Sequence, residues 1–129
     1  MLAVLLCTAL LGCGGGNDED EVRETVRTYL NAFADGDGER TCQQLTNEGR
    51  RGFLDALAAQ VPGLPTASCE EAVDALEDAG ADISVLRDVE LTEVNVDGDT
   101  ATVRAKGGTA DAELVKTDDG WRIDGGIDF

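Results

Sequence analysis

The stretch EVRETVRTYLNAF, residues 21–33, decides the fold of the N-terminal half of this 129-residue chain. Its apolar side chains recur at the spacing that places them on one face of a helix. They are Val22, Val26, Tyr29, Leu30 and Phe33. Asp18 and Glu21 have the spacing of a capping box before this face, and Gly36 is a typical stop signal after it. We therefore predict a helix over residues 19–35.

Further helices are expected between this helix and residue 80. A short helical turn over residues 39–45 is followed by Thr46, a preferred N-cap residue for a helix over about 47–60. Ser68 begins a second capping box, and the helix that it starts covers about 69–79. Residues 19–79 are therefore predicted to be mainly helical.

After residue 82 the apolar period changes from that of a helix to the two-residue alternation of a strand. Gly-containing pairs suited to tight hairpin turns separate the alternating runs. The predicted strands cover residues 88–96, 99–106, 109–117 and 120–128. A change of phase near Thr92-Glu93 indicates a β-bulge. Helices followed by a one-sided antiparallel meander predict an α+β fold with the helices on one face of the sheet.

The charge of the chain limits its partners. It has 27 Asp and Glu against 10 Lys and Arg, for a formal net charge of −17. Nucleic-acid phosphates attract Lys and Arg and repel such a surface, so nucleic-acid binding is excluded. The chain has no histidine, which excludes Ser-His-Asp and Cys-His sites and leaves carboxylates as the only candidate bases. No cofactor is predicted.

The N-terminal run ends in Leu10-Leu11-Gly12-Cys13, which resembles the lipobox of bacterial lipoproteins. The resemblance implies that residues 1–12 are a signal peptide and that Cys13 becomes a lipidated N-terminus on the extracytoplasmic face of the cell membrane. Because no Lys or Arg precedes the apolar run, we expect the true start codon to lie upstream of Met1. Residues 13–20 are then the lipidated cysteine with a flexible acidic linker, and residues 21–129 are the folded domain.

The cysteines fit the same compartment. Cys7 would leave with the signal peptide and Cys13 would carry the lipid, so that Cys42 and Cys69 remain. An even pair in an exported domain indicates one disulfide, and the alternatives are two free thiols in a cytosolic protein or a metal site. Zinc sites of the usual kind need four nitrogen or sulfur ligands, so without histidine no metal site is predicted.

Four motifs in this order resemble the nuclear transport factor 2-like superfamily, and most of all its small exported actinobacterial lipoproteins. The motifs are the Val22–Phe33 pattern with Asp35-Gly36-Asp37, the pair Cys42 and Cys69-Glu70-Glu71, the run Val96–Val103, and Asp119-Gly120-Trp121-Arg122-Ile123. The resemblance covers residues 20–129. It implies a cone-shaped fold, with three N-terminal helices packed on a curved four-stranded antiparallel meander and a pocket at the wide end.

Large apolar side chains that could line such a pocket are Tyr29, Phe33, Phe53 and Trp121, although packing in the core is the more usual role of such residues. Ketosteroid isomerase, in the same superfamily, uses an Asp base in its cone. Here Asp111 and Glu113 alternate with the apolar residues of their strand and are expected to face solvent, so no catalytic residue is predicted.

The sequence therefore predicts a membrane-anchored, extracytoplasmic and non-enzymatic domain that binds a small apolar ligand or a protein partner of the cell envelope. Two alternatives remain open at this point. One is an isomerase or dehydratase with a carboxylate in its pocket, and the other is a structural module that forms homodimers through a face of its sheet.

Overall fold

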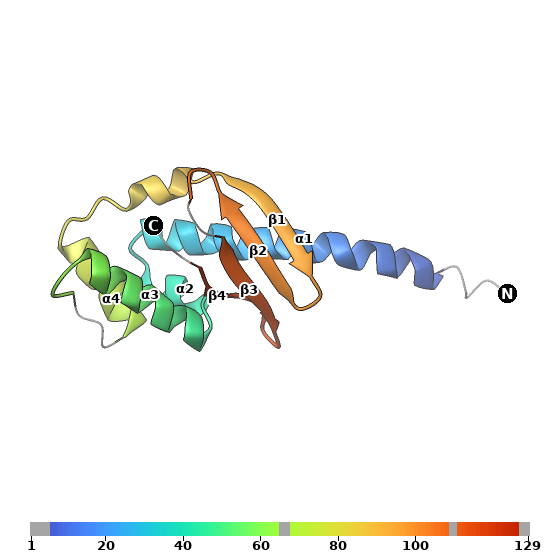
Figure 1. Ribbon diagram of the computed structural model, residues 1–129, viewed down its shortest axis with the longest axis horizontal. Coiled ribbons are helices and arrows are strands. Elements are labelled where there is room, and N and C mark those ends of the chain that lie inside the picture. The colour runs from blue at the N-terminus through green and yellow to red at the C-terminus, as the bar shows by residue number, and fades with distance from the viewer. Residues whose placement is uncertain (1–5, 65–67, 109–110, 127–129) are drawn as a thin grey trace.

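The computed structural model describes residues 6–64, 68–108 and 111–126. Helices come first in the chain, and the strands of one antiparallel sheet follow (Figure 1). The elements are α1 (Leu6–Ala34), α2 (Gly38–Gln43), α3 (Asn47–Gln60), α4 (Cys69–Asp78), the 3-10 helix η1 (Ser84–Asp88), β1 (Leu91–Asp97), β2 (Thr100–Ala105), β3 (Ala112–Thr117) and β4 (Gly120–Gly125). The sheet has the order β1-β2-β3-β4, which confirms the predicted α+β meander. Residues 1–5 of the predicted signal peptide, and residues 109–110 and 127–128 of the predicted strands, lie outside the described residues.

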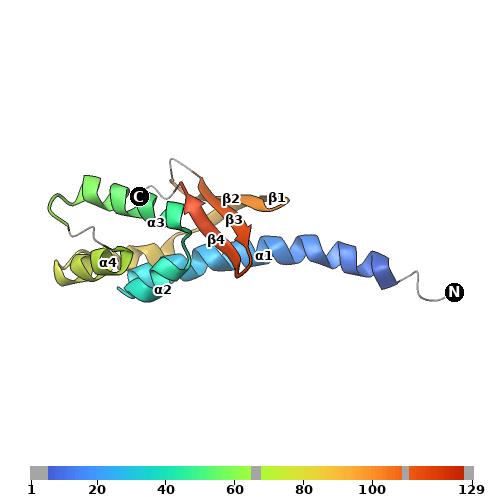
Figure 2. The same cartoon turned by 90° about the horizontal axis from the view of Figure 1, so that it is seen from below.

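α1 is longer than predicted. It begins at Leu6, and its N-terminal part extends beyond the rest of the domain (Figures 1 and 2). Residues 13–20, for which the sequence predicts a flexible linker, continue this helix, since each residue added to an existing helix adds one hydrogen bond. The capping box predicted at Asp18 is wrong, because Asp18 lies inside α1.

The other predicted helix boundaries agree with the structure. At the end of α1, Gly36 has a φ of 74°, and the N–H of Asp37 donates to the carbonyl of Ala32 in a Schellman-type turn. At the start of α3, Thr46 Oγ1 accepts a 3.0 Å hydrogen bond from the N–H of Gly49. At the start of α4, the hydroxyl of Ser68 accepts in the same way from the N–H of Glu71.

The predicted disulfide between Cys42 and Cys69 is present and joins α2 to α4. Both cysteines are buried, with 0% and 3% of their surface exposed. The backbones also approach closely beside the bridge, because a Cβ at Gly38 would lie within 2.8 Å of the carbonyl oxygen of Glu70. The bridge therefore closes a tightly packed helix contact.

The register of the sheet gives it one buried and one polar face. Leu114 pairs with Ala101 on one side and Ile123 on the other, and all three side chains are buried. One position along, Thr102 pairs with Glu113, whose side chain is exposed on the opposite face. This alternation confirms the predicted phase of the strands.

Two irregularities interrupt the ladders. The predicted bulge near Thr92 is confirmed, since the register between β1 and β2 shifts between Leu91 and Glu93. A second shift in β4 leaves Asp124 without a pairing partner in β3. The carboxylate of Asp124 instead accepts a 2.7 Å hydrogen bond from the hydroxyl of Thr46, which ties β4 to the start of α3.

The outer edge of β4 is covered by the connection between α2 and α3. The N–H of Ile123 donates to the carbonyl of Gln44 at 2.7 Å, and the N–H of Thr46 donates to the carbonyl of Ile123 at 2.9 Å. A short parallel bridge between Leu45 and Ile123 results. The helical layer and the sheet are therefore joined by backbone hydrogen bonds as well as by side chains.

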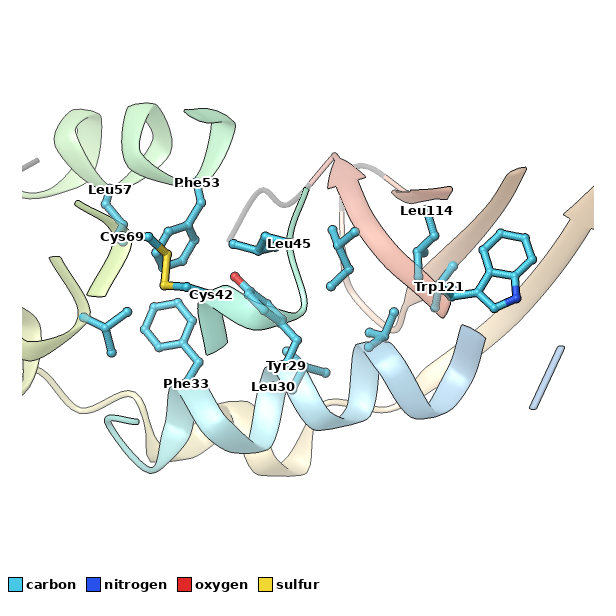
Figure 3. Packing of buried hydrophobic residues seen from close by; sticks show 14 of the residues in the cluster. Tyr29, Leu30, Phe33, Cys42, Leu45, Phe53, Leu57, Cys69, Leu114 and Trp121 are labelled. Carbon is cyan, nitrogen blue, oxygen red and sulfur yellow. A yellow bond between two sulfur atoms is a disulfide. The ribbon is translucent and has the colours of Figure 1, made fainter. Parts of the chain in front are cut away.

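The core lies between the buried face of the sheet and the helices (Figure 3). α1 crosses this face, and its predicted apolar residues are all buried. They are Val22, Val26, Tyr29, Leu30 and Phe33. The amphipathic pattern of residues 21–33 thus positions the centre of the domain.

Candidate functional site

Three of the four residues predicted to line a pocket pack against one another. The rings of Tyr29, Phe33 and Phe53 meet edge to face, with centroids 5.3 to 6.2 Å apart. Each of the three side chains has 2% or less of its surface exposed. Figure 3 shows them beside the Cys42–Cys69 disulfide, between α1 and α3. The ring edges and faces that a ligand would contact are therefore occupied by other side chains.

The hydroxyl of Tyr29 is protonated, and therefore neutral, in the buried aromatic cluster. Burial raises its pKa well above the ordinary value of 10.0, because a phenolate would lose its hydration. A buried phenol can donate a hydrogen bond but does not serve as a base near neutral pH. The geometry assigns Tyr29 a packing role together with Phe33 and Phe53.

Trp121, the fourth predicted residue, lies at the other end of the core beside Leu114 (Figure 3). Its indole Nε1 donates to the carboxylate of Asp18 at 3.4 Å. The ammonium of Lys116 lies 6.0 Å from the centre of the Trp121 ring and donates to the same carboxylate at 3.0 Å. We call Asp18, Lys116 and Trp121 the α1 anchor, because they join α1 to β3 and β4.

The α1 anchor shifts the titration of both of its charged groups. The hydrogen bond from Lys116 lowers the pKa of Asp18 from its ordinary value of 3.8, and the indole hydrogen bond of Trp121 acts in the same direction. The carboxylate in turn raises the pKa of Lys116. Both groups are therefore charged at neutral pH, and the interaction is an ion pair.

A second contact holds α1 to the same strand. The hydroxyl of Thr25, which is 9% exposed, donates to the carbonyl of Trp121 at 3.3 Å and to the carbonyl of Glu21 at 3.0 Å. Both the indole and the backbone carbonyl of Trp121 therefore form hydrogen bonds with α1. Two turns of α1 are fixed to one residue of β4.

The carboxylates that an isomerase would need are placed on the outside. Glu113 faces solvent, and Asp111 forms an ion pair with Arg104 at 2.9 Å on the outer face of the sheet. Across residues 18–64, 68–108 and 111–126, the buried polar side chains are Thr25 and Thr41, and none is an Asp or Glu. The predicted phase, in which acidic residues alternate away from the core, is confirmed for Glu113.

The structure offers no metal centre in its described part, since no three Cys, Asp or Glu side chains there are grouped to hold an ion. Among the described helices, none combines the length and the hydrophobicity needed to cross a bilayer. Cys13 lies within the backbone of α1, and its lipidation remains a prediction. No protein family, curated protein or solved structure shows significant similarity to this chain.

The sequence analysis missed the α1 anchor. One feature of the sequence could have indicated it. Lys116 is two positions after Leu114, so both side chains lie on the core face of β3, where a charged side chain needs a partner. The partner, Asp18, lies 98 positions away in the sequence and was assigned to a helix cap. Pairing of this kind depends on how α1 crosses the sheet.

Proposed function

We propose that this chain is a lipid-anchored extracytoplasmic domain of the nuclear transport factor 2-like fold that binds a protein partner through its surface. The cone-shaped fold is supported by the element order and by the bulged antiparallel meander packed on α1. The lipid anchor is supported by Leu10-Leu11-Gly12-Cys13 and by the disulfide, which is typical of exported domains.

One observation favours a protein partner over a small apolar ligand. Tyr29, Phe33 and Phe53, which would line the pocket, fill the space between α1 and α3 with their own rings. A ligand of the size of one ring would have to displace part of this cluster, at a cost similar to opening a core. Binding at the surface carries no such cost.

The chemistry of that surface is acidic. α4 contains no Lys or Arg, and it exposes Glu71, Asp74, Glu77 and Asp78 opposite its buried face. A partner with a basic contact surface would be attracted to such a helix, and its association rate would fall with rising salt concentration. We therefore propose an envelope protein with a basic patch as the partner.

The lipid anchor at Cys13 is tested by the intact mass of the protein purified from the membranes of a lipoprotein-processing host. We expect a chain that begins at Cys13 and carries a diacylglyceryl group. Cys13→Ser should abolish both the cleavage and the lipid, whereas the matched control Cys7→Ser should leave both unchanged. A full-length, unmodified chain in the membrane fraction would contradict the lipid anchor.

The binding mode is tested by native mass spectrometry of the gently purified mature protein. We expect a monomer without added small-molecule mass. Cross-linking in membranes should capture complexes with the partner that become fewer at high salt. Asp74→Lys should reduce the yield of these complexes. A small apolar molecule retained on the monomer would favour the ligand alternative, and a stable homodimer would favour the structural module. The control is Glu48→Lys, which places the same charge change on α3 rather than on α4.

A further inference from the structure

We infer that α1 fixes the orientation of the domain on the bilayer, with its hairpin end facing the lipid. This inference rests on the proposed attachment of the chain through Cys13. The hairpin end is the end of the domain that carries the β1–β2 turn at Gly98-Asp99 and the β3–β4 turn at Asp118-Asp119. Both turns point toward the side on which α1 extends from the domain (Figures 1 and 2).

The α1 anchor decides where the chain leaves the fold. Among residues 18–34 of α1, Asp18 is the first with a contact to the sheet, through Lys116 and the indole of Trp121. About two turns later, Thr25 binds the backbone of the same tryptophan. Both strand residues stand next to the β3–β4 turn. The exit point of α1 is therefore fixed at the hairpin end.

The tether between the lipid and this exit point is short. Cys13 and Asp18 are five positions apart, which is about 7.5 Å along a helix. Even a fully extended chain would span at most about 17 Å. By contrast, α1 continues from Asp18 to Ala34 over about 24 Å, toward the end of the domain that carries α4. The tether is too short for the domain to turn over while the α1 anchor holds.

The charges of the hairpin end keep it at the surface of the lipid and out of its interior. Asp97, Asp99, Asp118 and Asp119 lie in or beside the two turns, and Glu19 and Asp20 are exposed on the adjacent part of α1. Anionic headgroups repel these carboxylates over roughly the Debye length of about 8 Å. The domain therefore stands on the membrane with α3 and α4 directed away from it, where the proposed envelope partner can reach them.

The chain carries its own reporter of this orientation, because Trp121 is its one tryptophan. Energy transfer from Trp121 to a dansyl headgroup lipid is measured in phosphatidylcholine vesicles with two samples. The first is the lipidated mature protein. The second is the full chain with Cys7→Ser, coupled through the Cys13 thiol to a maleimide headgroup lipid, which tethers the chain at the same residue whether or not cells lipidate it.

We expect strong transfer from Trp121 in both samples. A reporter at the far end is provided by Ala59→Trp combined with Trp121→Phe, since Ala59 is exposed in the last turn of α3. Transfer from this position should be several-fold weaker. A second variant keeps Trp121 and adds Ala59→Trp, which leaves the α1 anchor unchanged. Its average energy-transfer efficiency over the two tryptophans should fall below that of the wild type.

Equal transfer from the two positions, or stronger transfer from position 59, would overturn the inferred orientation. A rise in average efficiency on adding Ala59→Trp would overturn it as well. Absence of lipid on the first sample would contradict only the proposed lipidation of Cys13, because the coupled sample still measures the orientation. Asp18→Asn should bring the two efficiencies closer together in the coupled sample, whereas Asp20→Asn, a neighbouring exposed carboxylate outside the α1 anchor, should not.

Discussion

Lys116 of β3 donates a 3.0 Å hydrogen bond to Asp18 of α1, across 98 positions of sequence. The pKa of Asp18 is lowered in the folded protein, so this contact contributes stability that is complete above the ordinary pKa of 3.8. The contribution is lost as the pH falls through the lowered folded-state pKa. We expect Lys116→Gln to destabilise the protein at pH 7 and to have a much smaller effect at pH 2, measured by urea unfolding at both values.

The matched control for this prediction is Lys106→Gln. Lys106 is exposed and pairs with Glu90 at 3.7 Å, in a contact that solvent screens. Its removal should change stability little at either pH. An equal loss for Lys116→Gln at pH 7 and pH 2 would show that the side chain acts through packing on Trp121 instead of through its charge.

Two glycines of α3 are expected to respond in opposite directions to alanine. A Cβ at Gly49 would overlap the carbonyl oxygen of Ile123 in β4, so Gly49→Ala should cost about 1–3 kcal/mol of unfolding free energy. A Cβ at Gly52 would meet no atom within 4 Å. Gly52→Ala should therefore stabilise the helix by about 0.5–1 kcal/mol. Chemical denaturation of the two variants beside the wild type tests the pair, and stabilisation by both changes would disprove the close approach of α3 to β4.

Removal of the Cys42–Cys69 bridge should lower stability by about 3.5 kcal/mol, on the chain-entropy estimate for a sequence separation of 27. The double variant Cys42→Ala with Cys69→Ala measures this in guanidinium unfolding. All variants are measured in the full-length chain, where Cys7→Ser is the control because Cys7 takes no part in the bridge. Addition of a reductant should destabilise the wild type and leave the double variant unchanged; a reductant effect on both would point to another cause.

Tyr29 should resist ionisation until the protein unfolds. Its folded-state pKa is raised by burial, so its contribution to stability is complete below the ordinary value of 10.0 and is lost as the pH rises further. Since Tyr29 is the one tyrosine, phenolate absorbance reports it directly. We expect phenolate to appear together with loss of the near-ultraviolet circular dichroism of Trp121. Phenolate formation in the folded protein near pH 10 would indicate that solvent reaches the aromatic cluster.

The local features of the fold could be predicted from the sequence because they depend on neighbouring residues. Thr46 and Ser68 cap helices because each hydroxyl accepts from an N–H three positions later. The bulge near Thr92 is visible as a break in the alternation of the strand. The disulfide was predicted because Cys42 and Cys69 remain as a pair in the domain that the sequence predicts to be exported, and two residues can pair in only one way.

The candidate site could not be predicted in the same way. The sequence showed which side chains are apolar, but Tyr29, Phe33 and Phe53 pack together only because α3 crosses beside α1. Trp121 was grouped with them by size, yet it lies at the hairpin end beside Asp18. An apolar pattern identifies a buried face without specifying which residue of a distant element it meets.

The sequence by itself determined most helices and strands, the phase of the strands and the acidic charge, and it indicated the disulfide, since each depends on residue type or on short spacings. Tertiary structure alone decided that Asp18 binds Lys116 and Trp121, that Asp124 binds Thr46, and that Phe53 packs on Tyr29 and Phe33. These contacts join residues far apart in the chain. They form only when the packing of the core brings the elements together, because no local preference places the two partners side by side.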